Sequence, residues 1–123
     1  PDKTMADLKN ALPKTWGSPT MAPHCADEVK YGIVDKVVKH FEAARDRGEK
    51  VAGQAIRDLV TVNGVRVTVE DGTWGLVRAS SNKPELVVVV ESPASEARMR
   101  EMFATVDGVL RTHPEVGEYN QTI

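Results

Sequence analysis

The sequence has little of several residue types, and each shortage excludes a class of protein. Its 123 residues include one cysteine, Cys25, so an internal disulfide is excluded. No apolar run is long enough to span a bilayer, and no signal peptide is visible. Sixteen Lys and Arg stand against eighteen Asp and Glu, which is not the basic excess typical of nucleic-acid binding. We therefore predict a cytoplasmic protein that neither binds nucleic acid nor enters a membrane.

Metal ligands and pairs of nucleophile and base are also scarce. His24 and Cys25 are adjacent, but no third ligand has the spacing that a zinc site needs. His40 is placed at the surface of a helix, and His113 reads as part of a helix stop. Ser80 lacks the His and Asp partners of a hydrolase triad. We expect no catalytic residue, no metal and no cofactor in this chain.

The length of 123 residues fits a single domain. The chain begins with Pro1 instead of Met, which suggests a piece of a longer protein. Residues 1–15 are predicted to be the tail of a preceding domain, with a short helix at 4–12. Residues 16–19 are rich in turn formers and predict a hinge, so the folded domain is expected at 20–123.

Two segments have helical periodicity. Apolar residues recur every three or four positions from Asp27, a good N-cap, to Gly48, a good C-terminus. Lys30 falls among the polar positions of this helix and is placed on its solvated face. The second helix is predicted to begin at Ser92-Pro93 and to stop before Pro114.

The middle of the sequence predicts a β-meander. The expected strands are a weak edge strand at 19–23, then 60–62, 65–70, 73–79 and 86–90. The continuous apolar run 86–90 predicts a central strand covered on both faces. Trp74 is expected to pack in the core, and 116–123 reads as a polar tail. The fold class is therefore α+β, with both helices packed on an antiparallel sheet of about four strands.

One loop between two predicted strands suits anion binding. It contains five donors: Arg78, Ser80, Ser81, Asn82 and Lys83. The Arg78 guanidinium matches a phosphate with two parallel hydrogen bonds, and Lys83 adds a second positive charge. Serine and asparagine are also common turn formers, so on composition alone a plain connecting loop explains these residues equally well.

A family resemblance favours the anion site. The stretch Asn63-Gly64-Val65-Arg66-Val67, then Trp74-Gly75-Leu76-Val77-Arg78-Ala79-Ser80 and Pro84, resembles the last domain of the phosphohexomutases. In that family, which includes phosphomannomutase and phosphoglucomutase, the pattern is approximately DGVRV followed by WGLVRASNTxP. The resemblance covers nearly the whole chain. It implies a fold like that of the TATA-box-binding protein.

The resemblance also implies a function. Such enzymes interconvert hexose 1- and 6-phosphates through a phosphoserine and a bisphosphorylated sugar, with magnesium bound in another domain. The last domain holds the substrate phosphate, at positions that match Arg78 and Ser80 here. Ser81 and Asn82 replace the Asn and Thr of the common pattern, and Lys83 also departs from it. We therefore expect a phosphate clamp that is inactive in isolation and works with the other domains of its enzyme.

Two questions stay open at this stage. Mannose phosphate and glucose phosphate are both possible substrates, and glucosamine phosphate is a third, because the sugar is read by a different domain in this family. A different class of function is a small α+β module for protein interaction or regulation. The strand at 86–90 would then offer an apolar face to a partner.

Overall fold

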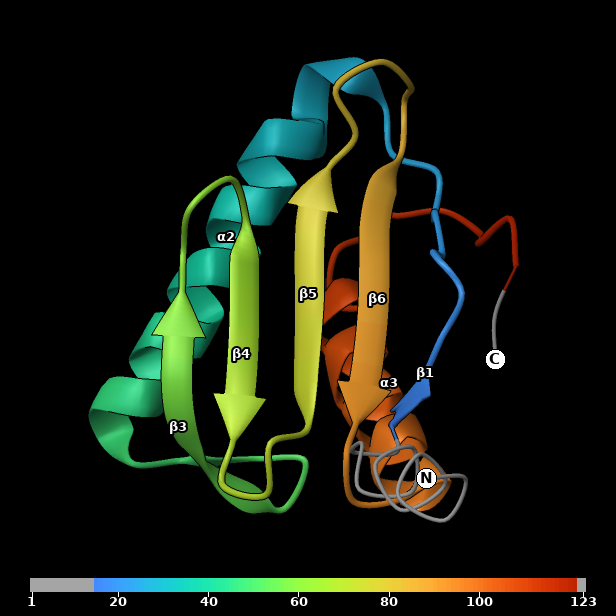
Figure 1. Cartoon of the computed structure of the whole chain (residues 1–123). Helices are drawn as coiled ribbons and strands as arrows, with labels where there is room; N and C mark the ends of the chain where they lie inside the picture. Colours follow the sequence, from blue (N-terminus) through green and yellow to red (C-terminus); the bar gives the residue numbers. More distant parts are fainter. Residues whose placement is uncertain (1–14, 122–123) are drawn as a thin grey trace, which may run out of the picture.

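The structure is a computed structural model and describes residues 15–121. The helix predicted at 4–12 lies outside these residues. The elements are β1 (Trp16–Gly17), α2 (Asp27–Arg47), β2 (Lys50–Val51), β3 (Gln54–Val60), β4 (Val65–Val69), β5 (Trp74–Ala79), β6 (Leu86–Ser92) and α3 (Glu96–Leu110). The strands form one sheet in the order β1-β6-β5-β4-β3-β2, with every neighbouring pair antiparallel (Figure 1).

The two helices cover one face of the sheet and leave the other face without a helix (Figure 1). The register decides which side chains face the helices, because they alternate between the two faces along each strand. Val65 of β4 pairs with Val77 of β5, which pairs with Val88 of β6, and all three are buried. The predicted α+β class is confirmed.

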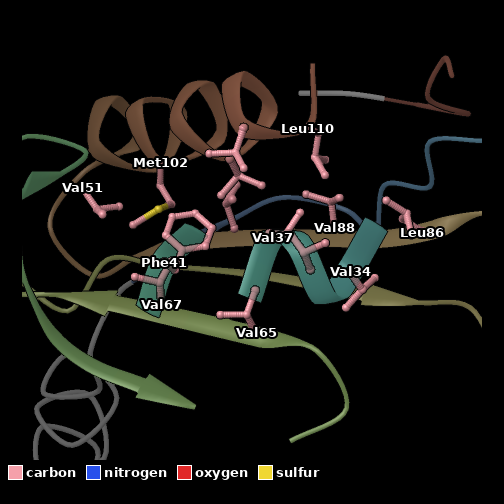
Figure 2. Packing of buried hydrophobic residues seen from close by; sticks show 14 of the residues in the cluster. Val34, Val37, Phe41, Val51, Val65, Val67, Leu86, Val88, Met102 and Leu110 are labelled. Carbon is pink, nitrogen blue, oxygen red and sulfur yellow. The ribbon is translucent and has the colours of Figure 1, made fainter. Parts of the chain in front are cut away.

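The core fills the space between the helices and the sheet. Phe41 of α2 and Met102 of α3 point toward one another, and Val67 of β4 lies beside Phe41 (Figure 2). Phe41 is 1% exposed and Met102 is fully buried. Together with the valines of the covered sheet face they form one continuous apolar cluster.

The sheet has more strands than predicted, since two-residue strands stand at both edges. The strand predicted at 60–62 is wrong in its bounds, because β3 occupies 54–60 and residues 61–64 form the connection to β4. A register shift between Ile56 and Asp58 interrupts the two-residue alternation along β3, so the sequence shows no regular strand pattern there. Val62 is apolar but 78% exposed, so its hydrophobicity gave a false strand signal.

Both predicted helices are present, but their first residues differ. Asp27 is the first residue of α2, and Ala26 occupies the N-cap without a side-chain bond. The α3 helix begins at Glu96, because Ser95 is its N-cap and the Ser95 hydroxyl accepts from the Arg98 amide. Ser92, the predicted start, is the last residue of β6. The predicted C-terminus of α2 is confirmed, since Gly48 has the left-handed conformation.

The residues predicted as a hinge take part in the sheet. Trp16 and Gly17 form β1 and pair with Ser92 and Glu91 at the end of β6. Ser18 donates its amide to the Val90 carbonyl and accepts the Val90 amide on its hydroxyl. A rotation about these residues has to break those bonds, so a hinge here stays a prediction.

The edge of β6 continues to be covered beyond β1. The predicted edge strand at 19–23 is reduced to isolated bridges, of which Met21 to Val88 is one. The segment after α3, predicted as a polar tail, also lies here, because Val116 is buried and the Gly117 amide donates to the His24 carbonyl. The prediction of a tail is therefore wrong for the described part, up to residue 121.

Trp74 is not a core residue, contrary to the prediction. Its neighbour Gly75 faces α3, where an added Cβ would lie 2.9 Å from Val106 Cγ2, so the Trp74 side chain lies on the opposite, open face. There the Arg66 guanidinium stacks 4.2 Å from the centre of the indole. The sequence pattern missed this because the phase of β5 is set by the close approach of α3 at Gly75.

We expect Gly75→Ala to lower the free energy of unfolding by about 1–3 kcal/mol, because its methyl group would overlap the side chains of α3. Gly108→Ala, in α3, is the control, since no atom lies within 4 Å of its added Cβ. That control should be stabilised by about 0.5–1 kcal/mol. Urea denaturation of both variants tests this, and equal stability of Gly75→Ala and the unaltered chain would contradict it.

A polar cluster holds together the end of the molecule where α3 begins. The Arg98 guanidinium bonds Asp71 Oδ2 at 2.8 Å, Glu101 Oε2 at 3.1 Å and the Ala52 carbonyl. These bonds join α3 to the turns before β3 and before β5. Partial burial alone would raise the pKa of Asp71, but hydrogen bonds from Arg98 and Thr73 outweigh it and lower this pKa to about 2, from an ordinary 3.8.

This pKa predicts the acid sensitivity of the fold. The folded pKa of Asp71 lies below the unfolded one, so its contribution is fully present above about pH 4 and is lost as the pH falls toward about 2. We expect Asp71→Asn to lower the free energy of unfolding at neutral pH by about 1–2 kcal/mol and to flatten its decline in that window. Denaturation across this pH range is the measurement. Asp35→Asn, at an exposed ion pair, should keep the full decline.

Candidate functional site

A cavity of about 550 Å³ lies at the end of the sheet where the predicted loop is found. Three segments far apart in the sequence line it: α2, the turn between β3 and β4, and the end of β5 with the loop that follows. They lie together at the top of the molecule in Figure 1. The lining residues are Tyr31, Val34, Asn63, Gly64, Arg78, Ala79 and Ser81.

Arg78 supplies the positive charge of this cavity. It lies near the end of β5, opposite Val87 of β6, and is exposed. Many other arginines of residues 15–121 are paired, such as Arg98 with Asp71 and Arg111 with Asp107. Arg78 makes no ion pair or side-chain hydrogen bond within that range. Its full set of donors is therefore available to an anion.

The first half of the loop is folded on itself. Ser80 is 6% exposed, and its hydroxyl donates to Asn82 Oδ1 at 3.1 Å. Its amide donates to the Glu85 carbonyl at 3.0 Å. The next residue, Ser81, lines the cavity together with Arg78.

The second half of the loop is bonded to the start of α2. The Lys30 ammonium donates to the Lys83 carbonyl at 3.0 Å, and the Cys25 amide donates to the Pro84 carbonyl at 2.8 Å. The Lys83 side chain itself is exposed. The prediction that Lys30 lies on a solvated helix face is wrong, because Lys30 is 3% exposed.

Of the five predicted residues, Arg78 and Ser81 line the cavity. Ser80, Asn82 and Lys83 belong to the same loop but are not among the lining residues, and the phosphate-binding role of all five stays a prediction. The sequence reasoning missed Tyr31. It also did not place Asn63-Gly64 at the site, although the register of β4 with β5 brings these residues beside Arg78.

Gly64 allows this close approach of the turn to β5. Its φ of +130° disfavours a side chain, and an added Cβ would lie 2.3 Å from the Val77 carbonyl oxygen and 2.8 Å from Arg78 Cβ. Only glycine fits there without moving β5. The residue therefore fixes the distance between two walls of the cavity.

Other reactive groups lie outside this cavity. Cys25 is fully buried, and burial followed by the charge of Glu115 raises the pKa of its thiol, against a smaller opposite effect of Lys30. His24 bridges to Glu85 through the backbone, and the His40 ring packs edge-on against Phe41. Within residues 15–121, no three His, Cys, Asp or Glu side chains gather in a way that could hold a metal ion. None of the described helices has both the length and the apolar character needed to cross a membrane.

Fold and site together define an α+β domain in which an arginine without an ion pair among residues 15–121 lines a cavity of about 550 Å³. Residues 27–109 match the family of phosphoglucomutase/phosphomannomutase C-terminal domains. The chain belongs to this family, and the family resemblance seen in the sequence is confirmed.

Whole enzymes of known name share this segment. The chain is 33% identical over 117 residues to a phosphomannomutase/phosphoglucomutase of Pseudomonas putida, a match that covers 94% of the chain and 22% of that protein. It is 38% identical over 95 residues to a probable phosphoglucosamine mutase of Methanopyrus kandleri, covering 76% and 18%. A phosphopentomutase of Thermococcus kodakarensis is 33% identical over 79 residues, covering 64% and 16%. The chain thus spans about a fifth of these relatives.

A solved structure has the same fold. It is a phosphoglucomutase/phosphomannomutase family protein of Burkholderia thailandensis, which superposes with a TM-score of 0.60 at 22% identity. The superposition covers 86% of this chain and 19% of the other.

We expect Gly64→Ala to lower the free energy of unfolding by about 1–3 kcal/mol and to shift the amide signals of Val77 and Arg78, because the added methyl group would push β5 away. Gly32→Ala, on α2 beside Tyr31, is the matched control, since nothing lies within 4 Å of its added Cβ. Denaturation and amide spectra of both variants are the measurements. Unchanged Arg78 amide signals in Gly64→Ala would refute the claim that Gly64 sets the distance between this turn and β5.

Proposed function

We propose that this chain is the phosphate clamp of a sugar phosphate mutase of the phosphomannomutase/phosphoglucomutase type. The observation that carries the proposal is Arg78, which is among the residues that line the cavity and whose guanidinium has no anionic partner within residues 15–121. An arginine held by a strand at a cavity, with a serine beside it, is suited to grip a phosphate through two parallel hydrogen bonds.

The cavity suits a phosphate that carries a sugar. Its volume of about 550 Å³ lies within the range of small-molecule sites, roughly 300–1,000 Å³. Arg78 and Ser81 supply polar groups, while Tyr31 and Val34 of α2 supply a less polar wall. In this proposal, the phosphate of a hexose 1- or 6-phosphate binds at Arg78 and the ring extends along the cavity.

The names of the relatives support a role in reading phosphate. They differ in the sugar, which is mannose or glucose, glucosamine or a pentose, and they share a phosphorylated sugar. A domain that is similar to all of them suits the shared group better than the variable one. We propose mannose and glucose phosphates as the substrates of the whole enzyme, with the sugar read by another domain.

The reaction itself is assigned to the rest of the proposed enzyme. The phosphoserine and the magnesium ion would belong to other domains, so the isolated chain is expected to be inactive. Its proposed contribution is to hold whichever phosphate is not reacting and to close the cleft over the sugar, which keeps water from the phosphoserine. The proposed location is the cytoplasm, consistent with a single cysteine that is free and buried.

The open face of the sheet is proposed to face those other domains. Trp74, Leu76 and Val89 are half-buried there, and neither helix covers them. The alternative of an independent interaction module would use the same face. Family membership favours the first assignment, because the matched relatives contain this segment within a chain about five times longer.

We expect the 123-residue chain to bind mannose 6-phosphate weakly and in a salt-sensitive way, with shifts of the amide signals of residues 78–83. Arg78→Ala should weaken this binding by about 10–100-fold, the loss of one charge-assisted contact. Arg57→Ala is the control, since it removes the same charge from an exposed position of β3 outside the cavity. No shift at millimolar ligand, or equal binding by Arg78→Ala, would overturn the proposal.

A further inference from the structure

Lys30 stands out among the lysines of residues 15–121 because it is buried. Its side chain is 4% exposed, whereas that of Lys39 on the same helix is 72% exposed. Its carboxylate partner, Asp27 at 2.8 Å, is itself 67% exposed. Burying an ammonium group costs free energy that an exposed ion pair recovers only in part, and an apolar side chain of similar length would avoid this cost. Packing alone therefore does not explain a lysine here.

The contacts of Lys30 reach the loop after β5 and one wall of the cavity. Its ammonium donates to the Lys83 carbonyl at 3.0 Å and lies 5.3 Å from the centre of the Tyr31 ring. Lys83 belongs to the loop after β5, and Tyr31 lines the cavity from α2. One buried charge of α2 thus contacts both the loop and a residue of the cavity lining.

The Lys83 carbonyl is a central point of the loop. It also accepts the Glu85 amide at 2.8 Å, and the Glu85 carbonyl in turn accepts the Ser80 amide at 3.0 Å. Ser80 is the residue before Ser81, which lines the cavity. Fixing the Lys83 carbonyl therefore fixes, through two backbone hydrogen bonds, the place where the loop leaves Arg78.

We propose that Lys30 is the positioning residue of the phosphate loop, which we define as residues 79–85. Its ammonium holds the Lys83 carbonyl and keeps the loop in the form that places Ser81 beside Arg78. Lys30 does not touch the phosphate. The inference rests on the proposed function of the loop. It adds a residue that affects phosphate binding by holding the loop, without contacting the phosphate.

The test compares Lys30→Met with Lys36→Met in the 123-residue chain. Both variants remove one charge from α2, and Lys36 is exposed and outside the cavity lining. In Lys30→Met the Ser80 and Glu85 amides should exchange with solvent at least about fivefold faster, while the exchange of β4 amides stays unchanged. Binding of mannose 6-phosphate should weaken by a similar factor, since affinity falls with the fraction of loop in the binding form. Lys36→Met should show neither effect.

A second variant separates the loop contact from the ion pair and serves if Lys30→Met does not fold. Asp27→Asn removes the charge partner and leaves the Lys83 bond, so it should keep loop exchange and affinity within about twofold of the unaltered chain. If Asp27→Asn loosens the loop as much as Lys30→Met, or if Lys30→Met exchanges and binds like Lys36→Met, the positioning role is refuted. If the unaltered chain binds no sugar phosphate while Lys30→Met still loosens the loop, the failure lies in the proposed function.

Discussion

The pairing of β4, β5 and β6 in one antiparallel register is the constraint on which the rest of this domain depends. It aligns Val65, Val77 and Val88 on the face covered by the helices. Because side chains alternate along a strand, the same register sends Arg66 and Arg78 to the opposite face. A shift by one residue would bury two arginines and expose the core. The position of Arg78, the candidate phosphate-binding residue, is thus set by the hydrophobic pattern of β5.

The arginines at the two ends of the sheet differ in whether they are paired. At the end where α3 begins, Arg98 joins two turns and a helix through Asp71, Glu101 and the Ala52 carbonyl, and its charge is used within the domain. At the other end, Arg78 has no such partner within the described residues and lines the cavity. Arg98 thus stabilises the domain, whereas for Arg78, which has no carboxylate within reach among residues 15–121, we propose a role in binding.

A clamp that reads only phosphate has a physical advantage in a mutase of this family. In the proposed reaction either phosphate of the sugar must be held while the other reacts, and the ring presents different groups in the two orientations. Arginine and serine contacts to phosphate oxygens are the same in both cases. The loop is held by backbone bonds and by Lys30, so we expect the proposed clamp to keep one shape for both ends of the sugar.

The sequence by itself determined the class of this domain, the two helices, most of the central strands and the loop that follows Arg78. These are local properties: periodicity, turn residues and a motif of contiguous positions. The tertiary structure decided which of the loop residues line the cavity, and it brought Tyr31 and the turn at Asn63-Gly64 to Arg78. It also buried Lys30, which the helical pattern placed in solvent. Such placements depend on contacts between segments far apart in the sequence. A local pattern of residues therefore cannot predict which carbonyl group or cavity a given side chain will meet.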